Sequence, residues 1–180
     1  MKLFRYEGYN LTISEEALAL KAFRQVWNRD KSASKKRAIM ELGYCYFMED
    51  PRSDYQYIVD REERSKSIKE GEGLRPNWEP DTTVKEAMKL YASFKTTSAL
   101  LLEDTRVAVD KLRQLLRDID LTKEDDKGKP VYTLNTVTAT IKQIPSLIKD
   151  LDEAERALVK ELAQNDKVRG AQEKAIYEDL

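Results

Sequence analysis

Apolar residues recur at helical spacing along most of this chain, and the clearest pattern begins at Val84. When Val84 is taken as position a of a heptad repeat, a second apolar stripe follows the e positions. The a positions are Val84, Tyr91, Ser98, Thr105, Leu112 and Ile119, and the d positions are Ala87, Phe94, Leu101, Ala108 and Leu115. A pattern sustained over about five heptads predicts one long bundle helix of about 38 residues, roughly 57 Å in length.

The last third of the chain carries a second helical pattern, with apolar residues repeating from Val137 to Leu162. Pro145 is expected to kink or divide this helix. A charged turn precedes it, so residues 80–165 are predicted to form a long antiparallel helical hairpin. The tail, residues 166–180, is too polar to build a core of its own and is predicted to be an extended C-terminal arm.

Shorter elements are predicted before residue 80. Apolar and polar residues alternate in the first thirteen positions, which indicates an extended N-terminal arm or a short strand over residues 1–13. Ser14 is a good N-cap for the helix that follows. Prolines and glycines then divide residues 14–79 into short helices and a rigid connector. The fold class is therefore all-α, with a helical body over residues 14–165 and an extended arm at each end.

The densest aromatic stretch, YCYFMEDPRSDYQY, holds four of the nine tyrosines and the only cysteine. Surfaces that stack nucleic-acid bases interleave their rings with Lys and Arg. Here Arg52 is the only cation, and three acidic residues would repel phosphate. Protein interfaces favour Tyr and Met at their cores, so we interpret the stretch as core plus subunit contact. The candidate interface rings are Tyr44, Tyr46, Phe47, Tyr55 and Tyr57.

Three basic residues, Lys35, Lys36 and Arg37, stand in the first turn of a predicted helix. The helix dipole disfavours cations at this end, and an anionic partner would offset the mismatch. They are therefore candidate contacts for an anion or for nucleic acid. A solvated turn is the alternative interpretation.

Composition narrows the chemistry. The chain is 36% charged, with 32 basic and 33 acidic residues, so non-specific wrapping of DNA is not expected. It contains no histidine, the commonest general base, and one cysteine, which excludes a structural zinc site. Ion pairing between neighbouring turns explains the charges of Asp60–Arg64. We expect no catalytic residues, no metal and no cofactor, and hence no enzyme.

Targeting signals are not expected either. No run approaches the ~18 apolar residues that a membrane span needs, and the first residues do not form a signal peptide. Cys45 has no partner for an intrachain disulfide, and its neighbours indicate a small buried hydrophobe. These features fit assembly in a reducing cytoplasm, away from membranes.

Several phrases between residues 15 and 115, and one near the C-terminus, resemble a family of structural proteins of crAss-like tailed bacteriophages. The phrases are Asp30-Lys31, the tyrosine-rich stretch, Asp50-Pro51-Arg52-Ser53, Glu63-Arg64 and the closing Val168-Arg169-Gly170. The resemblance implies a virion structural protein: a subunit of an oligomeric ring in the head–tail connector or neck, lining or surrounding the DNA exit channel. It also makes Asp50, Arg52, Ser53 and Arg64 cap and interface residues.

The resemblance implies partners as well. The expected assembly is a homo-oligomeric ring, with about twelve subunits as the candidate order. Its neighbours would be the portal and other connector or tail proteins, with passive contact to DNA, after assembly in the host cytoplasm and in the finished virion. The alternative is a small helical adaptor or DNA-associated protein without catalytic activity, which would use Lys35, Lys36 and Arg37 against phosphate.

Overall fold

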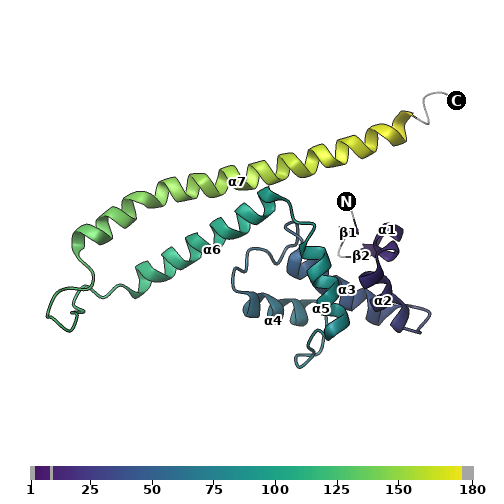
Figure 1. The fold of residues 1–180 in the computed structure, drawn as a ribbon, viewed down its shortest axis with the longest axis horizontal. Helices are drawn as coiled ribbons and strands as arrows, with labels where there is room; N and C mark the ends of the chain where they lie inside the picture. Colours follow the sequence, from purple (N-terminus) through teal and green to yellow (C-terminus); the bar gives the residue numbers. More distant parts are fainter. Residues whose placement is uncertain (1–2, 9, 176–180) are drawn as a thin grey trace. The chain divides into compact units, whose positions relative to one another are not determined.

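The computed structural model describes residues 3–8 and 10–175, except the side chains of Glu7 and of residues 165–175 (Figure 1). Its described residues form seven helices and one two-stranded sheet, which confirms a mainly helical fold. The chain divides into two compact units, Met1–Lys95 (unit 1) and Thr96–Leu180 (unit 2).

Unit 1 begins with a β-hairpin. Strands β1 (Phe4–Glu7) and β2 (Asn10–Ile13) pair antiparallel, and Gly8 takes a φ of 56° in the turn, a conformation that glycine adopts without a steric penalty. Leu3 and Phe4 are fully buried. Of the two predictions for residues 1–13, an extended arm or a short strand, the strand is therefore confirmed, and the described residues are not a free arm. Strand pairing satisfies their backbone groups, and burial of the apolar side chains holds the hairpin on the core.

Five helices complete unit 1. They are α1 (Glu15–Ala19), α2 (Lys21–Arg29), α3 (Lys36–Glu49), α4 (Arg61–Gly71) and α5 (Thr82–Ala92). Ser14 caps α1 as predicted, because its hydroxyl accepts a hydrogen bond from the Ala17 amide at 3.2 Å. Helix α3 lies at the centre of the unit and contacts α2, α4, α5 and β2 (Figure 1). Every residue from Glu41 to Asp50 is buried, so the second half of α3 is covered on all sides.

Unit 2 consists of α6 (Thr97–Asp118) and α7 (Leu134–Ala175). The two helices share a small core, and polar pairs join them. The core residues are Ala99, Leu102, Ala154 and Leu158. The Thr96 hydroxyl donates to Glu161 at 3.0 Å, and Arg106 donates to Glu155 at 2.9 Å. From the first pair to the second, the residue number rises on the α6 side, from 96 to 106, and falls on the α7 side, from 161 to 155, so the two helices run in opposite directions.

The prediction of one continuous helix from Val84 to Ile119 is wrong, since α5 ends at Ala92 and α6 begins at Thr97. Local hydrogen bonds explain the break. The Ser93 hydroxyl donates to the Leu90 carbonyl at 2.6 Å, and the Thr96 hydroxyl accepts from the Ala99 amide at 3.3 Å as the N-cap of α6. Side chains of this kind compete with the helical ladder and favour a new helix start.

Helix α7 is longer than the sequence predicts. It runs through Pro145 without being divided, and it continues to Ala175. Residues 166–175 are therefore helical and do not form an extended arm. Ala, Gln, Glu and Lys are good helix formers and are frequent there, so the segment can continue a helix even though it is too polar to form a core. Residues 176–180, the rest of the predicted arm, lie outside the described residues.

Candidate functional site

The aromatic stretch on α3 belongs to the core of unit 1. Tyr44, Tyr46 and Phe47 are 2–4% exposed. The Phe47 ring has its edge or face against three other rings, with centroid distances of 5.2 Å to Tyr6, 5.2 Å to Tyr46 and 5.3 Å to Tyr55. These three candidate interface residues are therefore core residues in this structure. Other residues of the same chain cover these three side chains.

Ser53 and Arg64 are also buried, and both satisfy backbone carbonyls near the end of α3. The Ser53 hydroxyl donates to the Phe47 carbonyl at 2.9 Å. The Arg64 guanidinium donates to the carbonyls of Ile58 at 2.7 Å and Met48 at 3.2 Å. A buried carbonyl without a partner is costly, so these side chains act as caps inside the subunit rather than as contacts on its surface.

The remaining candidate interface residues reach the surface to different degrees. Tyr55 is half-buried, and its hydroxyl donates to Glu72 at 3.1 Å. Arg52 is bidentate to Asp50, at 2.9 and 2.7 Å. Tyr57 is 75% exposed. Of the five candidate interface rings, Tyr57 is thus the one that is mostly open to solvent.

Two buried carboxylates lie at the end of α3. Glu49 pairs with Lys95 at 2.8 Å and with Arg61, and both members of the Glu49–Lys95 pair are about 5% exposed. Asp50 pairs with Arg52 and accepts a hydrogen bond from the Tyr91 hydroxyl. Burial, and then the Asp50 carboxylate, raise the pKa of Tyr91 far above its usual value. Each of the two carboxylates has charged partners, and these ion pairs tie the end of α3 to neighbouring segments of unit 1.

The three basic residues that the sequence offers as anion contacts, Lys35, Lys36 and Arg37, have different surroundings in the structure. The Lys35 ammonium donates to the Asp30 carbonyl at 2.5 Å and lies 5.6 Å from the centre of the Trp27 ring. The Arg37 guanidinium donates to Glu41 at 2.9 Å. Within the described part of the chain, Lys36 has no hydrogen-bond or ion-pair partner. Lys35 and Arg37 therefore have partners within the subunit, and the Arg37 side chain is still 68% exposed.

Asp30 is a functional residue of the fold that sequence reasoning missed. Its carboxylate accepts hydrogen bonds from the Ser32 hydroxyl at 2.7 Å, the Ser32 amide at 2.9 Å and the Ala38 amide at 3.1 Å. These bonds lower the pKa of Asp30 to about 2. Asp30 thus supplies the negative charge that the N-terminus of α3 lacks in its own first turn. The Asp-x-Ser spacing is the signal that would have found it.

Unit 2 exposes an apolar seam along α6. We define the α6 seam as Leu101, Ala108, Leu112 and Leu115, and at 100° per residue they fall within about 60° of one another. Leu101 is 58% exposed and Leu115 is 41% exposed. The residues that contact α7, Ala99 and Leu102, lie about 140° around the helix. The d positions Leu101, Ala108 and Leu115 are therefore exposed in the described part of unit 2, whereas the a position Leu112 is half-buried.

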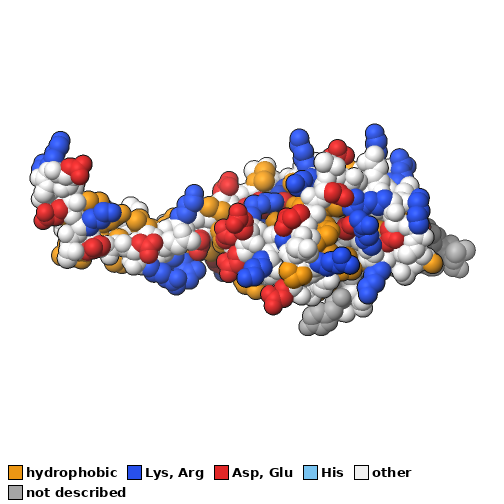
Figure 2. Space-filling model, turned by 90° about the horizontal axis from the view of Figure 1, so that it is seen from below, with side chains coloured by type: hydrophobic (Ala, Val, Ile, Leu, Met, Phe, Trp, Pro, Cys, Tyr) orange, Lys and Arg blue, Asp and Glu red, His pale blue; other side chains and the backbone are white. Residues whose placement is uncertain are grey.

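Helix α7 carries an apolar stripe of its own. We define the α7 stripe as Leu134, Ile141 and Ile148, which are spaced by seven residues and are each more than half exposed. At 100° per residue, the α7 stripe lies about 120° around its helix from Ala154 and Leu158, which contact α6, so the α6 seam and the α7 stripe each lie away from the contact between the two helices. Figure 2 shows apolar side chains of this kind at the surface between charged ones. Unit 2 thus presents two separate apolar surfaces.

The buried tyrosines of unit 1 predict loss of stability in alkali. Burial raises the pKa of Tyr46 and of Tyr55 to about 12. In the unfolded chain this value is about 10, so the folded state gains fully from both neutral phenols below pH 10 and loses that gain as the pH rises to 12. We expect the free energy of unfolding to fall over this range. Urea denaturation at stepped pH measures it.

The matched variant for this prediction is Tyr46→Phe, which keeps the ring and removes the ionisable hydroxyl. It is expected to lose less stability than the unchanged chain between pH 10 and 12. An identical loss in both proteins would show that Tyr46 does not contribute to the alkaline transition.

No described helix is both long enough and apolar enough to cross a membrane. Among residues 3–8 and 10–175, no group of three or more Cys, Asp or Glu side chains is placed to hold a metal ion. Comparisons with protein-family models, with curated proteins and with solved structures gave no match to this chain.

Proposed function

We propose that this chain is a virion structural protein whose copies assemble into a ring through the helices of unit 2. The observation that carries the proposal is the exposed α6 seam, in which Leu101 is 58% exposed although it occupies a d position. A heptad stripe on a helix is stabilised when it packs into a facing helix. An unpaired stripe therefore favours an additional helix from a second copy.

In this proposal the copies assemble through a long antiparallel hairpin. The sequence predicts this hairpin over residues 80–165, and in the proposal it consists of α6 and α7 alone. The α6 seam and the α7 stripe both lie away from the contact between the two helices, so the seam of one copy can meet the stripe of the next. Contacts between two different surfaces are heterologous, and they generate a closed ring when the rotation between copies closes.

The place of the ring follows from the resemblance to structural proteins of crAss-like phages. We assign the chain to the head–tail connector or neck, where the ring would line or surround the DNA exit channel. Its neighbours would be the portal and other connector or tail proteins, and its role is not catalytic. The pairing of Lys35 and Arg37 inside the subunit argues against an adaptor that uses all three basic residues on phosphate.

Electron microscopy of the purified chain tests this function. Class averages are expected to show closed rings of one rotational order, with about twelve subunits as the candidate. Particles of many sizes without rotational symmetry, or single copies only, would contradict the ring. If rings form but do not bind purified portal protein, the proposed ring is supported and its assignment to the connector is contradicted.

A further inference from the structure

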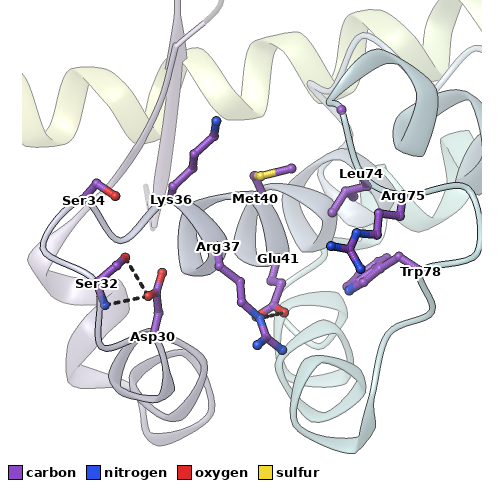
Figure 3. A pocket seen from close by; sticks show the side chains of 11 residues that line it. Asp30, Ser32, Ser34, Lys36, Arg37, Met40, Glu41, Leu74, Arg75 and Trp78 are labelled. Atoms are coloured by element: carbon purple, nitrogen blue, oxygen red, sulfur yellow. Dashed lines mark hydrogen bonds and ion pairs between the residues drawn. The ribbon is translucent and has the colours of Figure 1, made fainter.

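A hollow of about 710 Å³ lies in unit 1 across the first half of α3 (Figure 3). Three segments line it: the loop from Asp30 to Ser34, the exposed face of α3, and the connector from Gly73 to Trp78. Pockets that bind small molecules and cofactors measure about 300–1,000 Å³. The hollow therefore has room for a ligand of that class.

The charges that line the hollow leave two cations available. Asp30 and Glu41 line it as negative groups, but amides and a hydroxyl hold Asp30, and Arg29 and Arg37 hold Glu41. The side chains of Lys36 and Arg75 have no hydrogen bond or ion pair with any described residue.

Lys36 and Arg75 come from different elements, α3 and the connector, and stand on opposite sides of the hollow in Figure 3. The acidic groups at its base are occupied, and the free charges at its rim are positive. A ligand that carries an anionic group is therefore favoured.

An indole stands beside one of these cations. In Figure 3 the Arg75 guanidinium lies next to the Trp78 ring and points toward α3. Trp78 is half-buried and is fixed by an edge contact with Tyr44, with the ring centroids 4.9 Å apart. Met40 and Leu74 add apolar lining. An aromatic ring held in this way offers a stacking surface to a flat group, and arginine adds a cation to the same surface.

We propose that this hollow binds a nucleotide, with the phosphate between Lys36 and Arg75 and the base against Trp78. Phosphate carries more charge than one carboxylate and matches two separated cations, and the indole requires a flat ring on the same ligand. An acidic peptide supplies negative charge but lacks the flat ring that would stack on Trp78. The lining residues all belong to unit 1, so the inference is independent of ring assembly through unit 2.

Tryptophan fluorescence tests the proposal directly. The chain has two tryptophans, so Trp27→Phe leaves Trp78 as the only tryptophan, and its emission is excited selectively over that of the tyrosines. Titration with dAMP is expected to quench this emission to saturation. In that background, Lys36→Ala and Arg75→Ala are each expected to weaken binding by about tenfold, because each removes a charged hydrogen bond to phosphate. Calorimetric titration of the unchanged chain gives the same test without the Trp27 substitution.

The matched controls are Lys21→Ala and Arg24→Ala, which remove exposed cations of α2 that lie outside the hollow. They are expected to leave dAMP affinity unchanged. A loss equal to that of Lys36→Ala would show diffuse attraction to the surface and would overturn the site.

A second probe, a single-stranded octamer of deoxyadenylate, distinguishes a free nucleotide from a nucleotide within a nucleic-acid strand. Tighter binding of the octamer than of dAMP, lost with Arg75→Ala, assigns the site to a nucleic-acid strand. Equal affinity assigns it to a free nucleotide. Two results would overturn the proposal: neither probe quenches Trp78 and calorimetry detects no binding, or an acidic peptide binds while both probes fail.

Discussion

Replacement of Leu101 by Glu is expected to convert the assembled protein into single copies. Leu101 is 58% exposed in the isolated chain, so the new carboxylate costs the fold of one subunit little. In the assembly the same position would be covered by an apolar neighbour, and a buried charge without a partner is strongly unfavourable. Loss of a central interface contact costs about 2 kcal/mol or more, about 30-fold in the dissociation constant. Mass photometry measures the distribution of species.

The control for Leu101→Glu is Gln114→Glu, which adds the same single charge to the same helix. Gln114 is exposed and lies about 130° around α6 from the centre of the α6 seam. Its replacement is expected to leave the assembly intact. If both variants assemble like the unchanged chain, the α6 seam is not a contact between copies. If both fail to assemble, added charge on α6 rather than the seam is responsible.

Replacement of Phe47 by Ala is expected to lower the free energy of unfolding by about 3–5 kcal/mol. Phe47 is 2% exposed and contacts rings from β1, from α3 itself and from the segment after α3. Truncation removes the transfer free energy of the ring and leaves a cavity that a helix covered on all sides cannot close. Urea denaturation, followed by circular dichroism, measures the loss.

Tyr57→Ala is the matched control for Phe47→Ala, because this tyrosine is 75% exposed. Its expected effect on the free energy of unfolding is within about 0.5 kcal/mol. A near-neutral effect of Phe47→Ala on unfolding, combined with loss of assembly, would move this ring from the core to an interface. The core described for unit 1 would then be wrong.

Local signals in the sequence predicted the parts of the fold that depend on neighbouring residues. Pro51 places the end of α3 correctly, since the helix stops at Glu49 with Asp50 as its C-cap. Ser14 likewise marks the start of α1. The run of apolar residues in α3 requires cover on all sides, and the structure supplies it.

The break between α5 and α6 shows why a heptad count alone fails. The a and d positions remain in register across residues 93–96, and the count gives no weight to the capping hydroxyls of Ser93 and Thr96. The sequence also pairs α7 with the heptad seam, whereas α7 contacts α6 through Ala99 and Leu102. Spacing along one helix specifies which residues share a face and leaves the choice of partner open.

Contacts between distant residues explain the other differences in the candidate site. The Lys95–Glu49 pair joins residues 46 positions apart, and the Tyr91 hydroxyl reaches Asp50 across 41 positions. No local pattern predicts such pairs. They place the acidic end of α3 inside unit 1, where sequence reasoning placed a contact between subunits.

Sedimentation equilibrium of the unchanged chain tests the central claim, that copies cover one another's exposed heptad seam, most directly. One copy has a mass of 20.9 kDa. We expect a defined multiple of this mass, which decreases toward a single copy with Leu101→Glu and stays the same with Gln114→Glu. A single species of 20.9 kDa at every concentration would show that the seam needs no second copy, and it would contradict the account.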